Sequence, residues 1–181
     1  MSEQNRFEAL CFLRLTAGAK SILEIGSRKG SFLRELAGFA QPGAKIYSID
    51  LGRDVEGNYP GEFYGNELRE TVKSLCDQGF NAECLISDSR QPDAIAWAAS
   101  RAPFDLIFID GDHSAEGVRA DWNSYSHMGQ LVAFHDLFNG SLGVGNLWQE
   151  IAAERNTAVI RGANSLMGIG IVFRDSPLYA S

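Results

Sequence analysis

The spacing of apolar residues is the feature that most constrains how this chain folds. Short runs rich in β-branched and aromatic residues alternate with longer segments whose apolar residues recur at helical spacing. Such alternation is typical of a mostly parallel sheet covered by helices. Seven strands are expected, at residues 21–25, 45–50, 82–87, 105–110, 131–135, 157–161 and 167–173.

Helices are expected between these strands, at about residues 31–40, 67–78, 92–100, 115–125 and 144–155, with a further helix at about 4–15. Pro92 suits a first helical turn, where a missing N–H is harmless, and Gly79 suits the position after a helix. The nearly continuous apolar segment 104–109 predicts a central strand buried on both faces. Residues 162–165 leave no room for a crossover helix, so the last two strands are expected to form an antiparallel hairpin at the sheet edge.

These elements predict an α/β fold of Rossmann-like type, a three-layer αβα sandwich around a seven-stranded, mostly parallel sheet with a C-terminal antiparallel hairpin. With 181 residues the chain has the size of one domain, 1–181, with an N-terminal helical segment (1–19) and a core (20–175). A composition of 45% hydrophobic and 22% charged residues excludes a disordered chain, and no apolar run is long enough to span a bilayer. The first residues lack the pattern of a secretory signal, so a cytoplasmic location is expected.

The chain carries a formal net charge of −7. An acidic protein lacks the basic footprint of nucleic-acid binding, so we expect a small-molecule partner, no nucleic acid and no membrane. The three cysteines, Cys11, Cys76 and Cys84, form no CxxC pair and therefore indicate neither a zinc site nor a disulfide framework. We expect them to be buried thiols.

The first strand runs into a turn that carries Glu24, Gly26 and Gly30 before the next helix. Glycine lets a ligand approach the backbone, and a helix N-terminus offers free N–H groups. A dinucleotide fingerprint requires glycine where Arg28 stands, and the Gly-Lys-Ser/Thr ending of a P-loop is absent. The segment is either a ligand-binding turn of another type or a purely structural strand-to-helix turn.

Acidic residues also follow the second and third strands. Asp50 lies about twenty residues after the glycine turn, where an acid can accept both hydroxyls of a ribose. Asp88, within the sequence Ser-Asp-Ser, could accept a hydrogen bond from an adenine amino group, although an aspartate at a strand end is commonly a helix cap or a loop residue. Together the three strand ends favour an adenosine ligand.

The fourth strand leads into Asp110, Asp112 and His113, and the fifth leads into His135 and Asp136. The carboxyl ends of neighbouring parallel strands share one edge, so these groups are expected to converge. Like charges at short range need a cation or protons to neutralise them, which predicts a divalent metal. In the alternative interpretation, Asp112 and His113 cap the following helix and His135 is a hydrogen-bonded histidine.

Two long loops, residues 51–65 and 136–145, follow strand C-termini, where open α/β sheets bind ligands. Their aromatic residues could form a wall over an acceptor or could pack against one another; they are Tyr59, Phe63, Tyr64 and Phe138. The acceptor site is either open or completed by a second subunit of a homo-oligomer.

The stretch Phe-Ile-Asp-Gly-Asp-His-Ser-Ala-Glu-Gly-Val at 108–118, with the acidic strand ends, resembles class I S-adenosylmethionine-dependent methyltransferases over about residues 20–175. The resemblance is strongest to the compact Asp-Gly-Asp-His branch, methyltransferase domain family 24. Its relatives include metal-dependent O-methyltransferases of macrolide sugars and cephalosporin hydroxylase-like proteins. The resemblance implies an S-adenosylmethionine-dependent methyltransferase that methylates a hydroxyl of a small molecule or sugar.

The resemblance also implies roles for individual residues. Cofactor contacts are implied for Glu24, Gly26, Ser27, Gly30, Asp50, Asp88, Ser89 and Asp110. Metal ligands are implied at Asp110, His135 and Asp136. Relatives have acidic or amide residues where His135 stands, so the metal is Mg²⁺ or, with an imidazole ligand, Mn²⁺, iron or Zn²⁺. His113 matches the general base of relatives, a role that suits a group whose pKa is near neutrality.

The sequence therefore predicts in-line methyl transfer to a small-molecule hydroxyl, with Asp110 and His113 as catalytic residues and His135 as a third metal ligand or a second base. Two alternatives keep the cofactor: a metal-independent methyltransferase and a catalytically silent adenosine-binding module. A nucleotide-binding oxidoreductase is disfavoured by the missing dinucleotide fingerprint.

Overall fold

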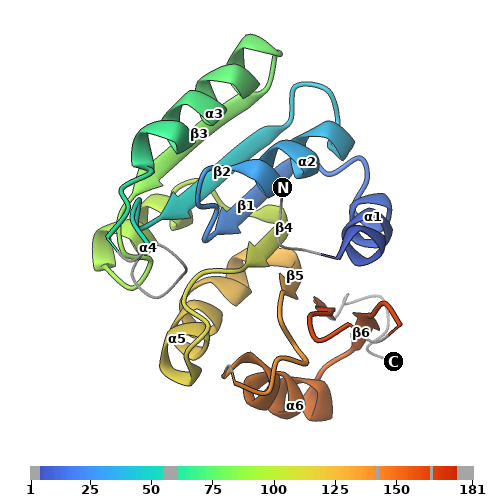
Figure 1. Ribbon diagram of the computed structural model, residues 1–181. Helices are drawn as coiled ribbons and strands as arrows, with labels where there is room; N and C mark the ends of the chain where they lie inside the picture. The colour runs from blue at the N-terminus through green and yellow to red at the C-terminus, as the bar shows by residue number, and fades with distance from the viewer. Residues whose placement is uncertain (1–4, 55–60, 142, 164, 175–181) are drawn as a thin grey trace.

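Seven strands form one sheet in the order β3-β2-β1-β4-β5-β7-β6 (Figure 1). The computed structural model describes residues 5–54, 61–141, 143–163 and 165–174. The strands are β1 (Ser21–Ile25), β2 (Lys45–Asp50), β3 (Asn81–Ile86), β4 (Phe104–Ile109), β5 (Gly129–Phe134), β6 (Thr157–Ile160) and β7 (Ile169–Phe173). Strands β1 to β5 are parallel, and β7 pairs antiparallel with β5 and β6, which confirms the predicted sheet and its terminal hairpin.

The helices of the described chain cover both faces of this sheet. They are α1 (Arg6–Leu15), α2 (Ser31–Phe39), α3 (Gly65–Asp77), α4 (Pro92–Ala99), α5 (Ala115–Tyr125) and α6 (Val144–Glu154), with a short 3-10 helix, η1 (Ser126–Met128), after α5. Helices α1, α2 and α3 contribute to the hydrophobic cluster on one face, and α4, α5 and α6 contribute to the cluster on the other. The three-layer α/β architecture is therefore confirmed.

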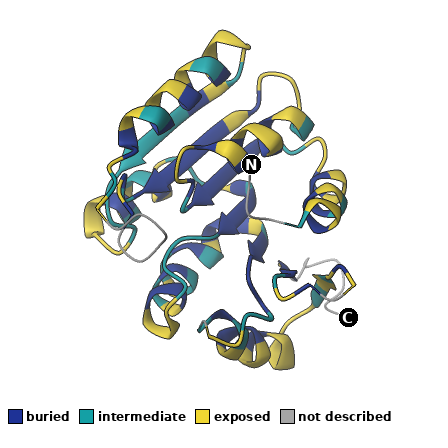
Figure 2. Cartoon of the chain, in the orientation of Figure 1, coloured by how far each residue is buried: buried dark blue, intermediate teal, exposed yellow. Residues whose placement is uncertain are grey.

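The central strands are buried on both sides, as their apolar sequence predicts (Figure 2). Ile22 and Phe108 pack among the residues of α1 to α3, whereas Leu23 and Ile107 pack among those of α4 to α6. Successive residues of a strand point to opposite faces, so a strand covered by two helical layers must be apolar throughout. The rigid centre of the sheet fixes where the carboxyl ends of β1 and β4 lie.

The ends of the elements follow the predicted signals with small differences. Pro92 lies in the first turn of α4, and Gly79, with φ of 93°, follows α3. Strand β4 ends at Ile109 and β5 at Phe134, one residue earlier than predicted. Asp110 and His135 are therefore the first loop residues after their strands.

The cysteines differ from the prediction of buried thiols. Cys76 is exposed, and Cys11 and Cys84 are half-buried. Cys84 lies on β3, and a strand at the edge of the sheet is less completely covered than a central one. Within the described residues, none of the helices has the length and apolar character needed to cross a membrane.

Candidate active site

The turn after β1 is shaped by close packing of the backbone. Gly26 has φ of 89°, and a Cβ at this residue would lie 2.2 Å from the carbonyl oxygen of Asp110. Gly30 has φ of 80°, and a Cβ there would lie 2.6 Å from Cγ2 of Thr71 on α3. A positive φ with no room for a side chain requires glycine. Packing between elements thus accounts for both glycines, as in the structural alternative, and their contact with a cofactor remains a proposal.

A buried carboxyl group lies beneath this turn. Burial raises the pKa of Glu24 to about 8, a shift that a hydrogen bond with Ser27 opposes and the charge of Asp110 reinforces. Among the residues that the structure describes, the Oε2 atom of Glu24 has no hydrogen-bond partner, and Ser48 donates a hydrogen bond to the Ser27 hydroxyl at 2.7 Å. At neutral pH the protonated form of Glu24 therefore predominates, and this carboxyl group is a potential donor.

Asp50, at the end of β2, is joined to the glycine turn. Its Oδ2 accepts a hydrogen bond from the backbone N–H of Arg28 at 2.7 Å, and its Oδ1 accepts one from the N–H of Gly52 at 2.6 Å. Burial raises the pKa of Asp50, although these two bonds oppose the shift. The structure therefore brings Asp50 and the turn after β1 together.

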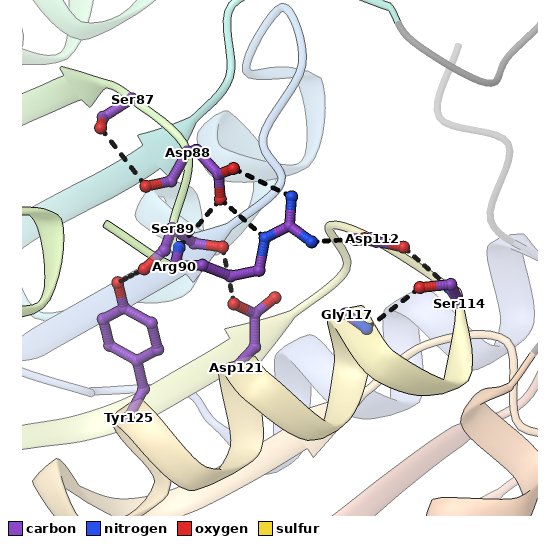
Figure 3. A network of polar contacts seen from close by, with 9 residues as sticks. All are labelled: Ser87, Asp88, Ser89, Arg90, Asp112, Ser114, Gly117, Asp121 and Tyr125. Carbon is purple, nitrogen blue, oxygen red and sulfur yellow. Dashed lines mark hydrogen bonds and ion pairs between the residues drawn. The ribbon is translucent and has the colours of Figure 1, made fainter. Parts of the chain in front are cut away.

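Asp88 and Ser89 lie in the turn after β3 and are engaged by neighbouring side chains (Figure 3). Arg90 donates to both oxygens of Asp88, from its backbone N–H and from its guanidinium, and this lowers the pKa of Asp88. Ser89 donates to Asp121 of α5 at 2.6 Å. Asp88 is thus a loop residue whose carboxylate is bound by Arg90 of the same turn. The presence of an arginine two residues after Asp88 is the feature of the sequence that could have indicated this contact.

Two carboxylates and two imidazoles converge after β4 and β5. Asp110 Oδ1 lies 3.1 Å from Nε2 of His113 and 3.3 Å from Nδ1 of His135. Asp136 Oδ2 lies 3.4 Å from Nδ1 of His113, and its Oδ1 lies 3.4 Å from Nδ1 of His135. The predicted convergence of these four residues is thus present in the structure.

The charges of this cluster balance one another. Burial alone would raise the pKa of Asp110, but hydrogen bonds with His113 and His135 outweigh it and lower the pKa to about 2. Burial alone would lower the pKa of both histidines, but the two aspartates raise that of His113 and bring that of His135 to about 10. The contacts between the carboxylates and the imidazoles therefore favour the charged forms of Asp110, His113 and His135.

A smaller group within this cluster has the donors of a metal site. One ligand atom from each of Asp110, His113 and Asp136 lies within 4.8 Å of the others. This group contains His113, whereas the sequence-based set contained His135. Asp136 has φ of 63°, a left-handed conformation that non-glycine residues rarely adopt, and among the described residues its buried Oδ1 has the 3.4 Å contact with His135 but no bond of hydrogen-bond geometry. Such strain concentrates at functional sites.

Asp112 does not join the cluster. Its Oδ1 accepts a hydrogen bond from the N–H of Ser114 at 2.9 Å, and the Ser114 side chain accepts one from the N–H of Gly117. Asp112 and Ser114 therefore organise the start of α5, which agrees with the helix-capping alternative for Asp112. His113, in contrast, points its ring atoms toward two carboxylates.

The aromatic residues of the long loops do not all face a common site. The buried Tyr64 donates its hydroxyl to the carbonyl oxygen of Arg53, and the ring of Phe138 packs against the guanidinium of Arg161 at 3.9 Å. Phe63 is exposed. Tyr59 lies outside the described residues. Tyr64 and Phe138 therefore contact Arg53 and Arg161, and these contacts support neither an aromatic wall nor packing of the aromatic residues against one another.

Sequence reasoning missed two residues that support the site. The N–H of Gly143 donates to the carbonyl oxygen of His113 at 2.8 Å, and a Cβ at Gly143 would lie 2.2 Å from the nitrogen of Ala115. Asp121 is an acid on the buried face of α5. An acidic residue among the apolar positions of a helix can be recognised in the sequence, so Asp121 could have been identified there. The contact of Gly143 with His113 is not apparent from the sequence.

Solved structures share this fold at low sequence identity. The O-methyltransferase of Bacillus cereus, in a complex with SAH, is 18% identical, with a TM-score of 0.67 over 95% of this chain and 83% of that chain. The N-methyltransferase NodS of Bradyrhizobium japonicum is 14% identical, with a TM-score of 0.62 over 94% and 95%. MycE, in a complex with Mg, SAH and mycinamycin VI, is 16% identical, with a TM-score of 0.60 over 89% of this chain and 46% of that chain. These likenesses establish the fold.

A family model establishes the family. No curated protein matches the chain. Residues 23–137, more than half of the sequence, match a model described as a methyltransferase domain, of the family 24 type. The matched segment contains the turn after β1, the ends of β2 to β5 and the whole Asp110 cluster. The chain therefore belongs to methyltransferase domain family 24, within the class I S-adenosylmethionine-dependent methyltransferases.

Proposed function

We propose that this chain transfers the methyl group of S-adenosylmethionine to a hydroxyl of a small-molecule acceptor, with a divalent cation at Asp110 and Asp136 and with His113 as general base. The observation that carries the proposal is the approach of Asp110, His113 and Asp136 to within 4.8 Å of one another. They follow β4 and β5, at the edge where open α/β sheets bind ligands.

The proposed cofactor site lies beside this cluster. Glu24 has a buried oxygen without a partner, and its predominantly protonated carboxyl could bond the methionine part of a cofactor. Asp50 accepts one backbone hydrogen bond on each oxygen, and a carboxylate has about four acceptor positions, so it can still accept ribose hydroxyls. The complex of the Bacillus cereus neighbour with SAH supports this class of ligand.

The donor set fits a divalent cation. Two carboxylates lie close together, and in the described part of the chain the buried Oδ1 of Asp136 lies 3.4 Å from His135 without a bond of hydrogen-bond geometry. With Asp110 and Asp136 as ligands the site suits Mg²⁺, the ion in the MycE complex, and an imidazole ligand from His135 would suit Mn²⁺, iron or Zn²⁺, which leaves His113 free to act as the base. When bound, the cation would hold the acceptor oxygen and make its hydroxyl more acidic.

Exposure favours His113 over His135 as the general base. The side chain of His113 is 29% exposed and that of His135 is 5% exposed, so a bound acceptor can reach only the former. His113 must be neutral to accept a proton, and its pairing with Asp110 and Asp136 favours the charged form. A cation bound to these carboxylates would offset their charge and would therefore favour the neutral form of His113, which can accept a proton.

A metal-independent methyltransferase is the second candidate. The observation in its favour is that His113 and His135 lie beside Asp110 and Asp136, which raises the pKa of both histidines and so favours charged imidazoles that offset carboxylate charge without a cation. In that case positioning of the cofactor and the acceptor would supply the acceleration.

Transfer of a labelled methyl group from S-adenosylmethionine to a panel of small hydroxyl compounds tests both candidates. The assay is run before and after exhaustive chelation, and after addition of Mn²⁺ or Mg²⁺. Activity that chelation removes and metal restores supports the metal-dependent reaction, whereas activity that chelation leaves unchanged supports the second candidate. Cofactor binding without transfer to any acceptor would support the silent adenosine-binding module.

A further inference from the structure

Two side chains of α5 reach the turn that follows β3 (Figure 3). Ser89 donates from Oγ to Asp121 Oδ1 at 2.6 Å, and the Tyr125 hydroxyl donates to the carbonyl oxygen of Ser89. Asp121 and Tyr125 are about one helical turn apart, so they project from the same face of α5. One helix thus holds both the side chain and the backbone of Ser89.

These bonds lie inside the protein. Asp121 is 1% exposed and Tyr125 is 0% exposed. Burial raises the pKa of Asp121 to about 6, and within the described residues its second oxygen, Oδ2, has no hydrogen-bond partner. A buried acid with an unmatched oxygen destabilises a fold, so core packing alone does not explain an aspartate at this position.

Asp121 also lies beside the turn after β4. A Cβ built on Gly111 would lie 3.5 Å from Asp121 Oδ2, which is ordinary van der Waals distance. The same carboxyl group is thus in contact with the turn after β3, through Ser89, and adjacent to the turn that carries Asp110 and His113. It occupies the junction between the proposed adenine contacts and the proposed catalytic residues.

Arg90 makes a second, more exposed link between these segments. Its guanidinium binds both oxygens of Asp88, and its Nη1 lies 3.7 Å from Oδ2 of Asp112. The Arg90 side chain is 46% exposed, and exposed ion pairs contribute little to stability. The buried bonds of Asp121 and Tyr125 are therefore the stronger constraint on the turn after β3.

We infer that Asp121 and Tyr125 are positioning residues for the adenine subsite, and that they align the turn after β3 with the catalytic turn after β4 by holding Ser89. The inference rests on the proposed function, because it presupposes a cofactor that contains adenosine. In this role both residues act through the placement of Asp88 and Ser89.

The test is a double-mutant cycle on the binding of S-adenosylhomocysteine and of adenosine, measured by calorimetry. Asp121→Ala and Ser89→Ala remove the same buried bond, so each is expected to weaken the binding of both ligands about tenfold or more. The double variant is expected to bind no more weakly than Ser89→Ala alone, which also removes the proposed contact of Ser89 with the cofactor. Asp121→Asn retains an oxygen that accepts from Ser89 and is expected to restore the affinity. Tyr125→Phe is expected to weaken binding about threefold. Asp93→Asn, at an exposed acid of α4, is the matched control.

The outcomes separate the inference from the proposed function. If the unaltered protein binds the ligands and Asp121→Ala and Tyr125→Phe bind them equally well, the inference alone is overturned. Additive effects of Asp121→Ala and Ser89→Ala overturn it as well. A loss that Asp121→Asn does not restore assigns Asp121 to stability of the fold and also overturns it. Failure of the unaltered protein to bind either ligand overturns the proposed function, and the inference with it.

Discussion

The turn after β1 and the cluster after β4 and β5 lie at the same edge of the sheet, but different forces shape them. In the turn, Gly26 and Gly30 adopt positive φ where no Cβ fits, and burial keeps the nearby carboxyl group of Glu24 protonated near neutral pH. In the cluster, Asp110 and Asp136 face His113 and His135, and these contacts lower the pKa of Asp110. Steric fit therefore determines which residues the turn requires, whereas electrostatic pairing determines the arrangement of the cluster.

This difference predicts two kinds of response to substitution. A change in the turn should act on folding and cofactor binding, because its residues are held by backbone contacts. A change in the cluster should act on the methyl-transfer reaction and on metal binding, because its residues interact through the charges of their side chains.

His113→Ala is expected to lower turnover by about 10²–10⁴-fold at saturating cofactor, the usual contribution of a general base. The fold should persist, since the His113 ring is partly exposed. Turnover is measured with labelled S-adenosylmethionine and the acceptor found in the panel. His127→Ala, at the histidine of η1, outside the cluster, is the control, and equal turnover in the two variants would refute the base.

Gly26→Ala is expected to lower the free energy of unfolding by about 2–5 kcal/mol, since it combines left-handed strain with a clash against Asp110. Gly18 has φ of 83°, and a Cβ at this residue would have nothing within 4 Å, so Gly18→Ala isolates the strain alone. Urea unfolding measures both. Equal losses in the two variants would show that close packing after β1 is not what requires glycine.

Glu24→Gln is expected to change how stability depends on pH. The pKa of Glu24 is about 8 in the folded state against an ordinary 4.5, so its stabilising contribution is complete below pH 4.5 and is lost as pH rises through 8. The glutamine side chain of the Glu24→Gln variant cannot titrate, so the variant does not lose this contribution as pH rises. The free energy of unfolding of the variant, minus that of the unaltered protein, should therefore be larger at alkaline pH than at acid pH, by on the order of a few kcal/mol. Urea unfolding at about pH 5 and pH 8.5 gives this difference. An unchanged difference between the two pH values would contradict a buried, protonated Glu24.

Gly143→Ala is expected to reduce turnover about tenfold by displacing the loop that holds the carbonyl oxygen of His113. Gly140→Ala is the matched control, because nothing lies within 4 Å of a Cβ at that residue. Steady-state assays at saturating cofactor compare the two. If they retain the same turnover, the Gly143 contact does not position the base.

The fold followed from the sequence because its signals are local. The apolar segment 104–109 identified the central strand, and the short connection at 162–165 identified the terminal hairpin. The bounds of α5 were predicted as observed, since Ser114 provides an N-cap before it. Strand β5 begins two residues earlier than predicted, at Gly129, because pairing with β4 extends it over residues without an apolar pattern.

The site could be predicted only in part, because its details depend on contacts between distant segments. Convergence of Asp110, His113, His135 and Asp136 follows from parallel strands that end at one edge. That Gly30 packs against Thr71 of α3 is invisible in the sequence. That Asp112 turns toward Ser114 rather than the cluster was one of two open alternatives, and only the geometry decides between them.

The most direct test of the central claim is a calorimetric titration of Mn²⁺ into the unaltered protein and two variants of the same motif, Asp110→Asn and Asp112→Asn. The account predicts one site per chain, lost in Asp110→Asn and retained in Asp112→Asn, because only Asp110 faces His113 and Asp136. Absence of a site in the unaltered protein, or a site that Asp110→Asn leaves intact, would contradict a metal-dependent methyl transfer at this cluster.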